Sequence, residues 1–111
     1  MIEIILRNYL SAKLNVPCYL EVPKTPPEAY VTLEKTGSSK NNHISESTFA
    51  IQAYSTSMYN ASSLISEVNG FMEELINLDE VSRVYLNSSY NFTDTTKKQY
   101  RYQSIFVITH Y

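Results

Sequence analysis

The sequence predicts an α+β fold: a mostly antiparallel sheet of about five strands packed with two helices, in the order α-β-β-β-α-β-β. Two stretches carry apolar residues at helical spacing, one near the start of the chain and one in its middle. Five shorter stretches alternate apolar and polar residues, as strands with one buried face do. Three strands in succession before the second helix favour antiparallel pairing with the helices segregated from the sheet. At 111 residues, the chain fits a single domain over residues 1–111.

The first predicted helix runs from Ile2 to Leu14, and Asn15 and Pro17 end it. The second is the clearest element, because one apolar stripe continues over five turns. That stripe consists of Ala61, Leu64, Ile65, Val68, Phe71, Met72, Leu75 and Ile76. A hydroxyl from Ser55, Thr56 or Ser57 is expected to cap its first turn.

The first two predicted strands are joined by a stiff connector. The first strand covers Cys18 to Val22 and the second covers Ala29 to Lys35. Between them lie Pro23, Pro26 and Pro27, and each proline fixes its own φ and restricts the residue before it. We therefore expect this segment to hold the second strand in position.

The remaining strands alternate with two polar stretches. Strands are predicted at Ser47–Tyr54, Val81–Ser88 and Gln99–His110. Polar loops are predicted at Gly37–Glu46 and Tyr90–Lys98, because neither stretch shows apolar periodicity.

Composition narrows the function classes. The net charge of −2 provides no concentrated positive charge for phosphate binding and no polybasic membrane signal. The chain has only two glycines, whereas the phosphate loops of Rossmann and Walker folds need several. A single cysteine excludes an internal disulfide and fits a reducing compartment.

The residues that could carry chemistry are few and scattered. Cys18 alternates with apolar residues and is expected to be a small core residue. His43 and His110 are far apart in the sequence, and no HxH, HxxxH or CxxC spacing is present. The sequence therefore predicts no enzyme, no catalytic residue, no cofactor and no metal site.

The tyrosines of the last strand allow two interpretations. Aromatic residues on a sheet can stack on bases, and the segment Tyr100–Val107 superficially resembles the third-strand signature of RNA-recognition motifs. It lacks the glycines of that signature, however, and tyrosine is also enriched at protein–protein interfaces. The second interpretation fits the composition better, and a small binding module for nucleic acid or a small ligand stays as the alternative.

The order of segments along nearly the whole chain resembles the tail terminator (tail completion) proteins of long-tailed bacteriophages. The resemblance is carried by VPKTPPEAYVTLEKTG at Val22–Gly37, by FAIQAYS at Phe49–Ser55, and by YNFTD and RYQSIFVITH near the end of the chain. One departure is Gly37-Ser38, where similar sequences carry a glycine pair.

This resemblance implies a function in assembly. It implies a homo-oligomeric ring, usually a hexamer, that caps the phage tail tube, stops its growth and joins tail to head. The implied partners are other copies of the chain, the tail tube protein and the head-completion (connector) protein, with DNA only as passing cargo in the channel and no membrane. The implied location is the head-proximal end of the virion tail, and the host cytoplasm during assembly.

No catalytic residues carry over from the resemblance, so we assign roles by region. Tyr90, Asp94, Arg101 and Tyr102 are predicted subunit contacts. The first polar loop, with Lys40 and His43, is either a docking arm that orders on assembly or a loop without a role. For Asp94 and the basic residues after it, a solvated loop stays open beside the subunit contact.

Overall fold

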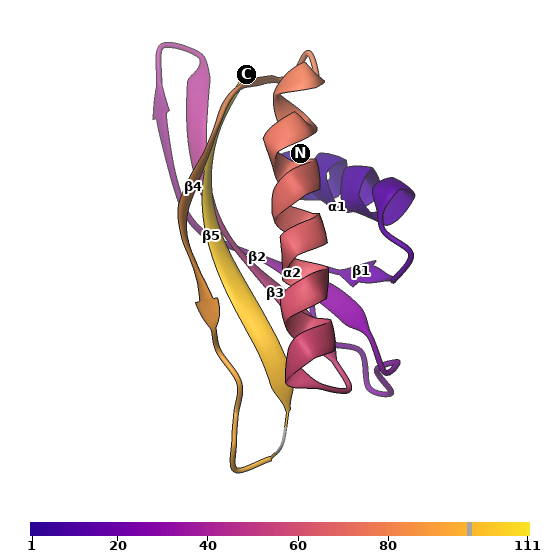
Figure 1. The fold of residues 1–111 in the computed structure, drawn as a ribbon. Coiled ribbons are helices and arrows are strands. Elements are labelled where there is room, and N and C mark those ends of the chain that lie inside the picture. The colour runs from indigo at the N-terminus through magenta and orange to yellow at the C-terminus, as the bar shows by residue number, and fades with distance from the viewer. Residues whose placement is uncertain (98) are drawn as a thin grey trace.

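The computed structural model describes residues 1–97 and 99–111, and it has the predicted α+β architecture (Figure 1). Five strands form one sheet in the order β1-β2-β3-β5-β4. The elements in chain order are α1 (Ile2–Lys13), β1 (Cys18–Tyr19), β2 (Tyr30–Asn41), β3 (Ile44–Ser55), α2 (Met58–Glu73), the 3₁₀ turn η1 (Glu74–Asn77), β4 (Val81–Asn91) and β5 (Tyr100–His110). All neighbouring strands are antiparallel except β1, which pairs with β2 in parallel.

Both helices lie on the same side of the sheet (Figure 1). Helix α2 runs along the sheet over β3 and β5, and α1 contacts α2, β1 and β2. The buried core lies between this helix layer and the inner side of the strands. Its largest fully buried side chains include Leu6, Leu10, Val68 and Met72 from the helices and Leu33, Phe49, Ile51, Phe106 and Ile108 from the strands.

The apolar periodicity of the sequence explains both helices. Ile2, Leu6 and Leu10 are the buried residues of α1, spaced four apart on one face. At the start of α2, the Ser57 hydroxyl accepts a hydrogen bond from the Asn60 amide, 3.1 Å away, which confirms one of the three expected caps. The predicted apolar stripe packs on the core as far as Leu75, and only its last residue, Ile76, is exposed at 46%, because the chain changes to η1 at Glu74.

The first strand is shorter than predicted. Only Cys18 and Tyr19 pair with β2, and the next alternating residues, Leu20 and Val22, are 41% and 50% exposed. The chain leaves the sheet before Pro23 because it must turn back through the proline connector to enter β2 in the parallel direction. Cys18 is buried in the core, as the sequence predicted.

The prediction of a polar loop at Gly37–Glu46 is wrong. These residues belong to a long hairpin in which β2 and β3 pair up to Asn41 and Ile44. Asn42 and His43 form its two-residue turn, both with positive φ (50° and 69°), as a type I′ turn requires. The prediction failed because most side chains here are exposed on both faces, so the pairing rests on backbone hydrogen bonds and leaves no apolar alternation.

The second predicted loop, Tyr90–Lys98, is also shorter than expected. Tyr90 and Asn91 belong to β4, which pairs with β5 as far as Tyr102. Asp94 and Gln99 form an isolated antiparallel bridge that narrows the loop. Lys98 lies outside the described residues. In the described part of the chain, neither helix has the length and apolar character needed to cross a membrane.

Candidate interaction surface

The side of the sheet opposite the helices carries polar and aromatic side chains from four of its strands. We call it the helix-free face; it is formed by Tyr30, Gln52, Tyr54, Arg101 and Gln103, with Arg83, Tyr85 and Tyr90 on β4. Side chains alternate between the two sides of a strand, so every second residue of β3 and β5 points here while the intervening ones enter the core.

A chain of hydrogen bonds crosses this face in one direction. Arg101 donates to the Tyr54 hydroxyl at 3.4 Å, and that hydroxyl donates to Gln52 Oε1 at 2.6 Å. Gln52 Nε2 donates to Gln103 Oε1 at 2.6 Å, and Gln103 Nε2 donates to the Tyr90 hydroxyl. The chain of donors therefore begins at Arg101 and ends at Tyr90, linking β3, β5 and β4 through side chains as well as through the backbone.

Arg101 holds the start of this chain in place. Its Nε donates to the Phe92 carbonyl at 2.7 Å, and its guanidinium lies 4.5 Å from the centre of the Phe92 ring. A second aromatic ring, that of Tyr54, lies 5.9 Å from the guanidinium. A cation between two aromatic faces is stabilised electrostatically, so Arg101 orders the rings around it.

Tyr30 extends the helix-free face onto β2. Its ring stacks on that of Tyr54 at 4.4 Å, and Tyr19 meets it edge-on at 6.1 Å. Tyr30 is 4% exposed, and this burial raises the pKa of its hydroxyl. The neighbouring Tyr54 raises that pKa further, whereas the Arg101 charge and a hydrogen bond with Gln99 oppose the shift.

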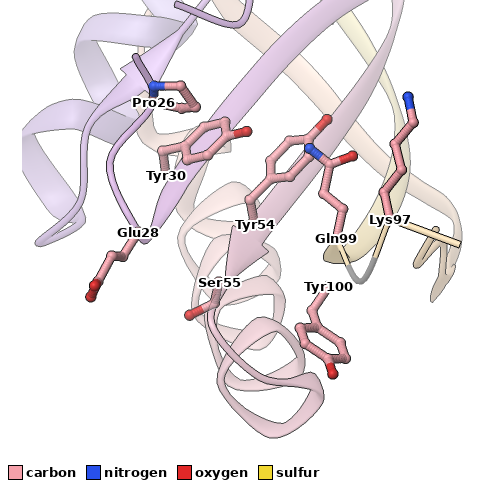
Figure 2. A pocket seen from close by; sticks show the side chains of 8 residues that line it. All are labelled: Pro26, Glu28, Tyr30, Tyr54, Ser55, Lys97, Gln99 and Tyr100. Carbon is pink, nitrogen blue, oxygen red and sulfur yellow. The ribbon is translucent and has the colours of Figure 1, made fainter. Parts of the chain in front are cut away.

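An open depression of about 390 Å³ lies beside the stacked tyrosines (Figure 2). Tyr30 and Tyr54 stand side by side in it, Pro26 and Glu28 come from the proline connector, and Lys97 and Gln99 come from the loop before β5. Ser55 and Tyr100 complete the lining. The depression therefore combines three aromatic rings with one acidic and one basic side chain.

Three aromatic rings on the helix-free face remain exposed. Tyr85 is 51% exposed, Tyr90 41% and Phe92 40%, and all three belong to β4 or to the residue that follows it. Tyr90 and Phe92 contact each other edge-to-face, with 6.1 Å between the ring centres. Exposed aromatic rings held in a fixed geometry are typical of protein contact surfaces.

Of the four contact residues predicted near the end of the chain, two belong to the hydrogen-bond chain on the helix-free face and two do not. Tyr90 and Arg101 lie on the helix-free face at opposite ends of the hydrogen-bond chain. Asp94 turns inward to its own loop, where its carboxylate accepts from the Thr96 and Lys97 amides. Tyr102 lies on the other side of β5, where it is half-buried and packs against the core.

Lys40 and His43 lie at the opposite end of the sheet from the β4–β5 loop, at the tip of the β2–β3 hairpin (Figure 1). Both are exposed. The six predicted contact residues therefore fall into separate regions of a molecule that is 45 Å long.

The prediction from sequence missed Gln52, Tyr54 and Gln103. The signal was present, because all three occupy the polar positions of strands that alternate with core residues. A polar residue on the solvated face of an antiparallel strand is ordinary. These residues can be identified as a connected group only when the register places Gln52 opposite Gln103 and Tyr54 opposite Arg101.

The potentially reactive groups do not converge. Burial raises the pKa of the Cys18 thiol, so the thiol is held in its neutral, less nucleophilic form. His110 contacts the Ser47 hydroxyl at 2.8 Å at the far end of β5. In residues 1–97 and 99–111, no three His, Cys, Asp or Glu side chains lie together in a way that could hold a metal ion.

Two comparisons with known proteins were negative. No protein-family model matches this chain, and no curated protein matches it.

Proposed function

We propose that this protein is a non-enzymatic virion structural protein that assembles into a ring on a phage tail tube. The ring stops growth of the tube and joins the tail to the head. The order of segments shared with tail terminator proteins supports this proposal, and so does the open character of the sheet surface. The partners in this proposal are other copies of the chain in a hexameric ring, the tail tube protein and the head-completion protein.

The observation that carries the proposal is the row of exposed rings, Tyr85, Tyr90 and Phe92, along an edge strand on the helix-free face. Tyrosine and phenylalanine contribute large contact area with few rotatable bonds, and they are enriched in the buried centres of protein interfaces. Arg101 and Gln103 fix two of these rings before any partner arrives, which reduces the entropy lost on binding.

A ring also requires that each copy present two different surfaces that fit each other around a rotation axis. The surface around β4 and the exposed β2–β3 hairpin with Lys40 and His43 lie on opposite edges of the sheet. In this proposal one contacts the next copy and the other receives the previous one. DNA passes through the channel without a specific site.

The test is solution mass by light scattering across a concentration series, followed by negative-stain images of any large species. The expected result is a closed ring of uniform size. Addition of purified tail tubes then distinguishes a tail protein from another ring, because capped tubes should stop elongating. A chain that stays monomeric alone and also fails to bind tail tubes would contradict the proposal.

The alternative function is a small binding module, and the depression beside Tyr30 and Tyr54 favours it. Its exposed Lys97 side chain is suited to a phosphate or another small anion, and the half-buried Tyr100 beside it is suited to a base. Fluorescence anisotropy with labelled single-stranded oligonucleotides tests this directly. Salt-sensitive binding by a monomer, lost on Lys97→Ala, would favour the binding module over the ring.

A further inference from the structure

The sheet has two open edges, and they differ from each other. On one side β1 pairs only with Val31 and Thr32, and every β2 residue from Glu34 to Asn41 is exposed. On the other side β4 is the terminal strand over all 11 of its residues. Each edge presents backbone N–H and C=O groups that can pair with another strand.

The strand directions make these two edges complementary. From β2 to β3, β5 and β4, each neighbour is antiparallel, so β4 runs opposite to β2. If the β4 edge of one copy meets the β2 edge of a copy in the same orientation, the two strands are antiparallel. A rotation about a ring axis roughly along the strands produces this arrangement, because it changes neither the height nor the direction of a strand.

The same reasoning fixes the register. Arg83, Thr109, Glu46 and Ser39 face one another in a row across the sheet. The next row on the same face contains Tyr85, Val107, Thr48 and Gly37. Joining equal rows places Arg83 of one copy opposite Ser39 of the next, and Tyr85 opposite Gly37.

Side-chain size fits this register. The β4 segment Arg83–Leu86 lies between two irregularities, and the second regular part of β2 begins at Gly37, after the irregularity that follows Lys35. Small residues at Gly37, Ser38 and Ser39 leave the β2 edge accessible. An aromatic ring opposite an edge glycine covers backbone that the glycine leaves exposed, so the Tyr85 ring gains a partner.

The charged residues near the two edges are also compatible with this register. Arg83 is the only charged residue of β4. On the helix-free face of β2 and β3 the charged residues are Glu34 and Glu46, whereas Lys35 points to the helix side and pairs with Glu3. In the joined sheets Arg83 lies opposite Ser39, with one strand between it and Glu46 of the next copy, about 10 Å between the two backbones. Its own Glu46 lies at the same separation across Thr109, so Arg83 lies between two glutamates. Extended arginine and glutamate side chains span that distance.

We propose that adjacent copies join edge to edge, with Arg83–Tyr85 of β4 pairing antiparallel with Gly37–Ser39 of β2 in the next copy and Tyr85 opposite Gly37. The pairing makes the sheets of neighbouring copies continuous. This inference deepens the proposed function and rests on it, because it specifies the contact through which the ring closes.

A disulfide tests both the pairing and its register. Residues directly opposite in an antiparallel pair have Cβ atoms close enough for a disulfide bond. The test variant carries Gly37→Cys with Tyr85→Cys. A side chain is tolerated at Gly37, since the nearest atom to an added Cβ is that of Thr48 at 4.0 Å. The matched control carries Lys40→Cys with Tyr85→Cys, because Lys40 points to the other side of the sheet.

The expected result under mild oxidation is a ladder of covalent oligomers from the test variant, ending at the size of the ring, while the control and both single variants stay monomeric on a non-reducing gel. Native Cys18 is 4% exposed and should not contribute. Rings by light scattering without this ladder would overturn the edge pairing and leave the proposed function standing. If the unsubstituted protein shows no self-association, with or without tail tubes, both the edge pairing and the proposed function are overturned.

Discussion

Tyr30 and Tyr54 stack with their ring centres 4.4 Å apart and their planes within 7° of parallel, directly opposite each other on β2 and β3. Both are at least 95% buried although they lie on the face without helices, at 4% and 5% exposure. Tyr19 meets the Tyr30 ring edge-on, and the Tyr54 hydroxyl is hydrogen-bonded to Gln52 and Arg101. The pair therefore acts as a second, small core on the helix-free face.

Alkaline pH should destabilise the protein through Tyr30. Its pKa is raised above the ordinary value near 10.0, so the unfolded chain loses this proton at a lower pH than the folded chain does. The contribution of Tyr30 to the free energy of unfolding is fully present below pH 10 and is lost as the pH rises through the raised pKa. The free energy of unfolding, measured by urea titration at successive pH values, should fall less steeply above pH 10 in Tyr30→Phe. Tyr59→Phe is the control for removal of a tyrosine hydroxyl, because Tyr59 is 81% exposed.

Gln103→Leu should lower the free energy of unfolding by about 1–3 kcal/mol, because it removes the middle of the hydrogen-bond chain. The Gln52 amide loses its acceptor at 2.6 Å, and Tyr90 loses its donor. The double variant Gln52→Leu/Gln103→Leu should cost less than the sum of the two single changes, since each single change leaves the other amide unsatisfied. Urea denaturation of the four proteins measures this, and strict additivity would show that the two amides are not coupled.

Arg101→Met should destabilise the protein by about 1–2 kcal/mol, since it removes a short hydrogen bond to the Phe92 carbonyl and the charge between two aromatic rings. Arg101→Lys should recover only part of this loss, because an ammonium group lacks the planar fork of the guanidinium. Arg83→Met is the matched control, with an expected change within about 0.5 kcal/mol in the monomer. Equal effects at the two arginines would contradict the special role given to Arg101.

His43→Gly should stabilise the hairpin by about 1 kcal/mol, because His43 has a φ of 69° that glycine adopts without strain. His43→Val should destabilise it by a similar or larger amount, since a β-branched residue is strongly disfavoured at positive φ. Thermal unfolding of both variants measures the difference. Glu46 lies within β3 at a nearby exposed position, and Glu46→Gly should lower the stability of the hairpin, since glycine weakens a strand.

Much of the fold could be predicted because burial leaves a periodic trace. The stripe from Ala61 to Leu75 and the alternation around Phe49 and Phe106 each record one buried face, so the helices, the order of elements along the chain and the core follow. The β2–β3 hairpin could not be found in this way, because residues such as Ser38 and Lys40 pair through their backbones while their side chains face solvent.

The surface was harder to predict than the fold. The sequence predicts Tyr90 and Arg101 as contact residues by region, but the hydrogen bonds that connect them run through Gln52, Gln103 and Tyr54. These three residues share two rows of the sheet with Tyr90 and Arg101, and the rows exist only once the strands are paired. Tyr102 is one residue from Arg101 and points to the opposite side of the sheet. A strand must be placed in its register before such neighbours can be told apart.

The position of β5 has a consequence for synthesis of the protein. It is the last strand along the chain, yet it lies between β3 and β4 near the middle of the sheet. On the ribosome, β3 can pair with β2 at once, but about 45 further residues, from Ser55 to Tyr100, must emerge before its second partner arrives. Until then β3 and β4 each expose an unpaired apolar edge that can aggregate. We expect that premature termination within β5 leaves a product that cannot close its sheet, and that chaperone binding during translation is strongest just before this strand leaves the exit tunnel.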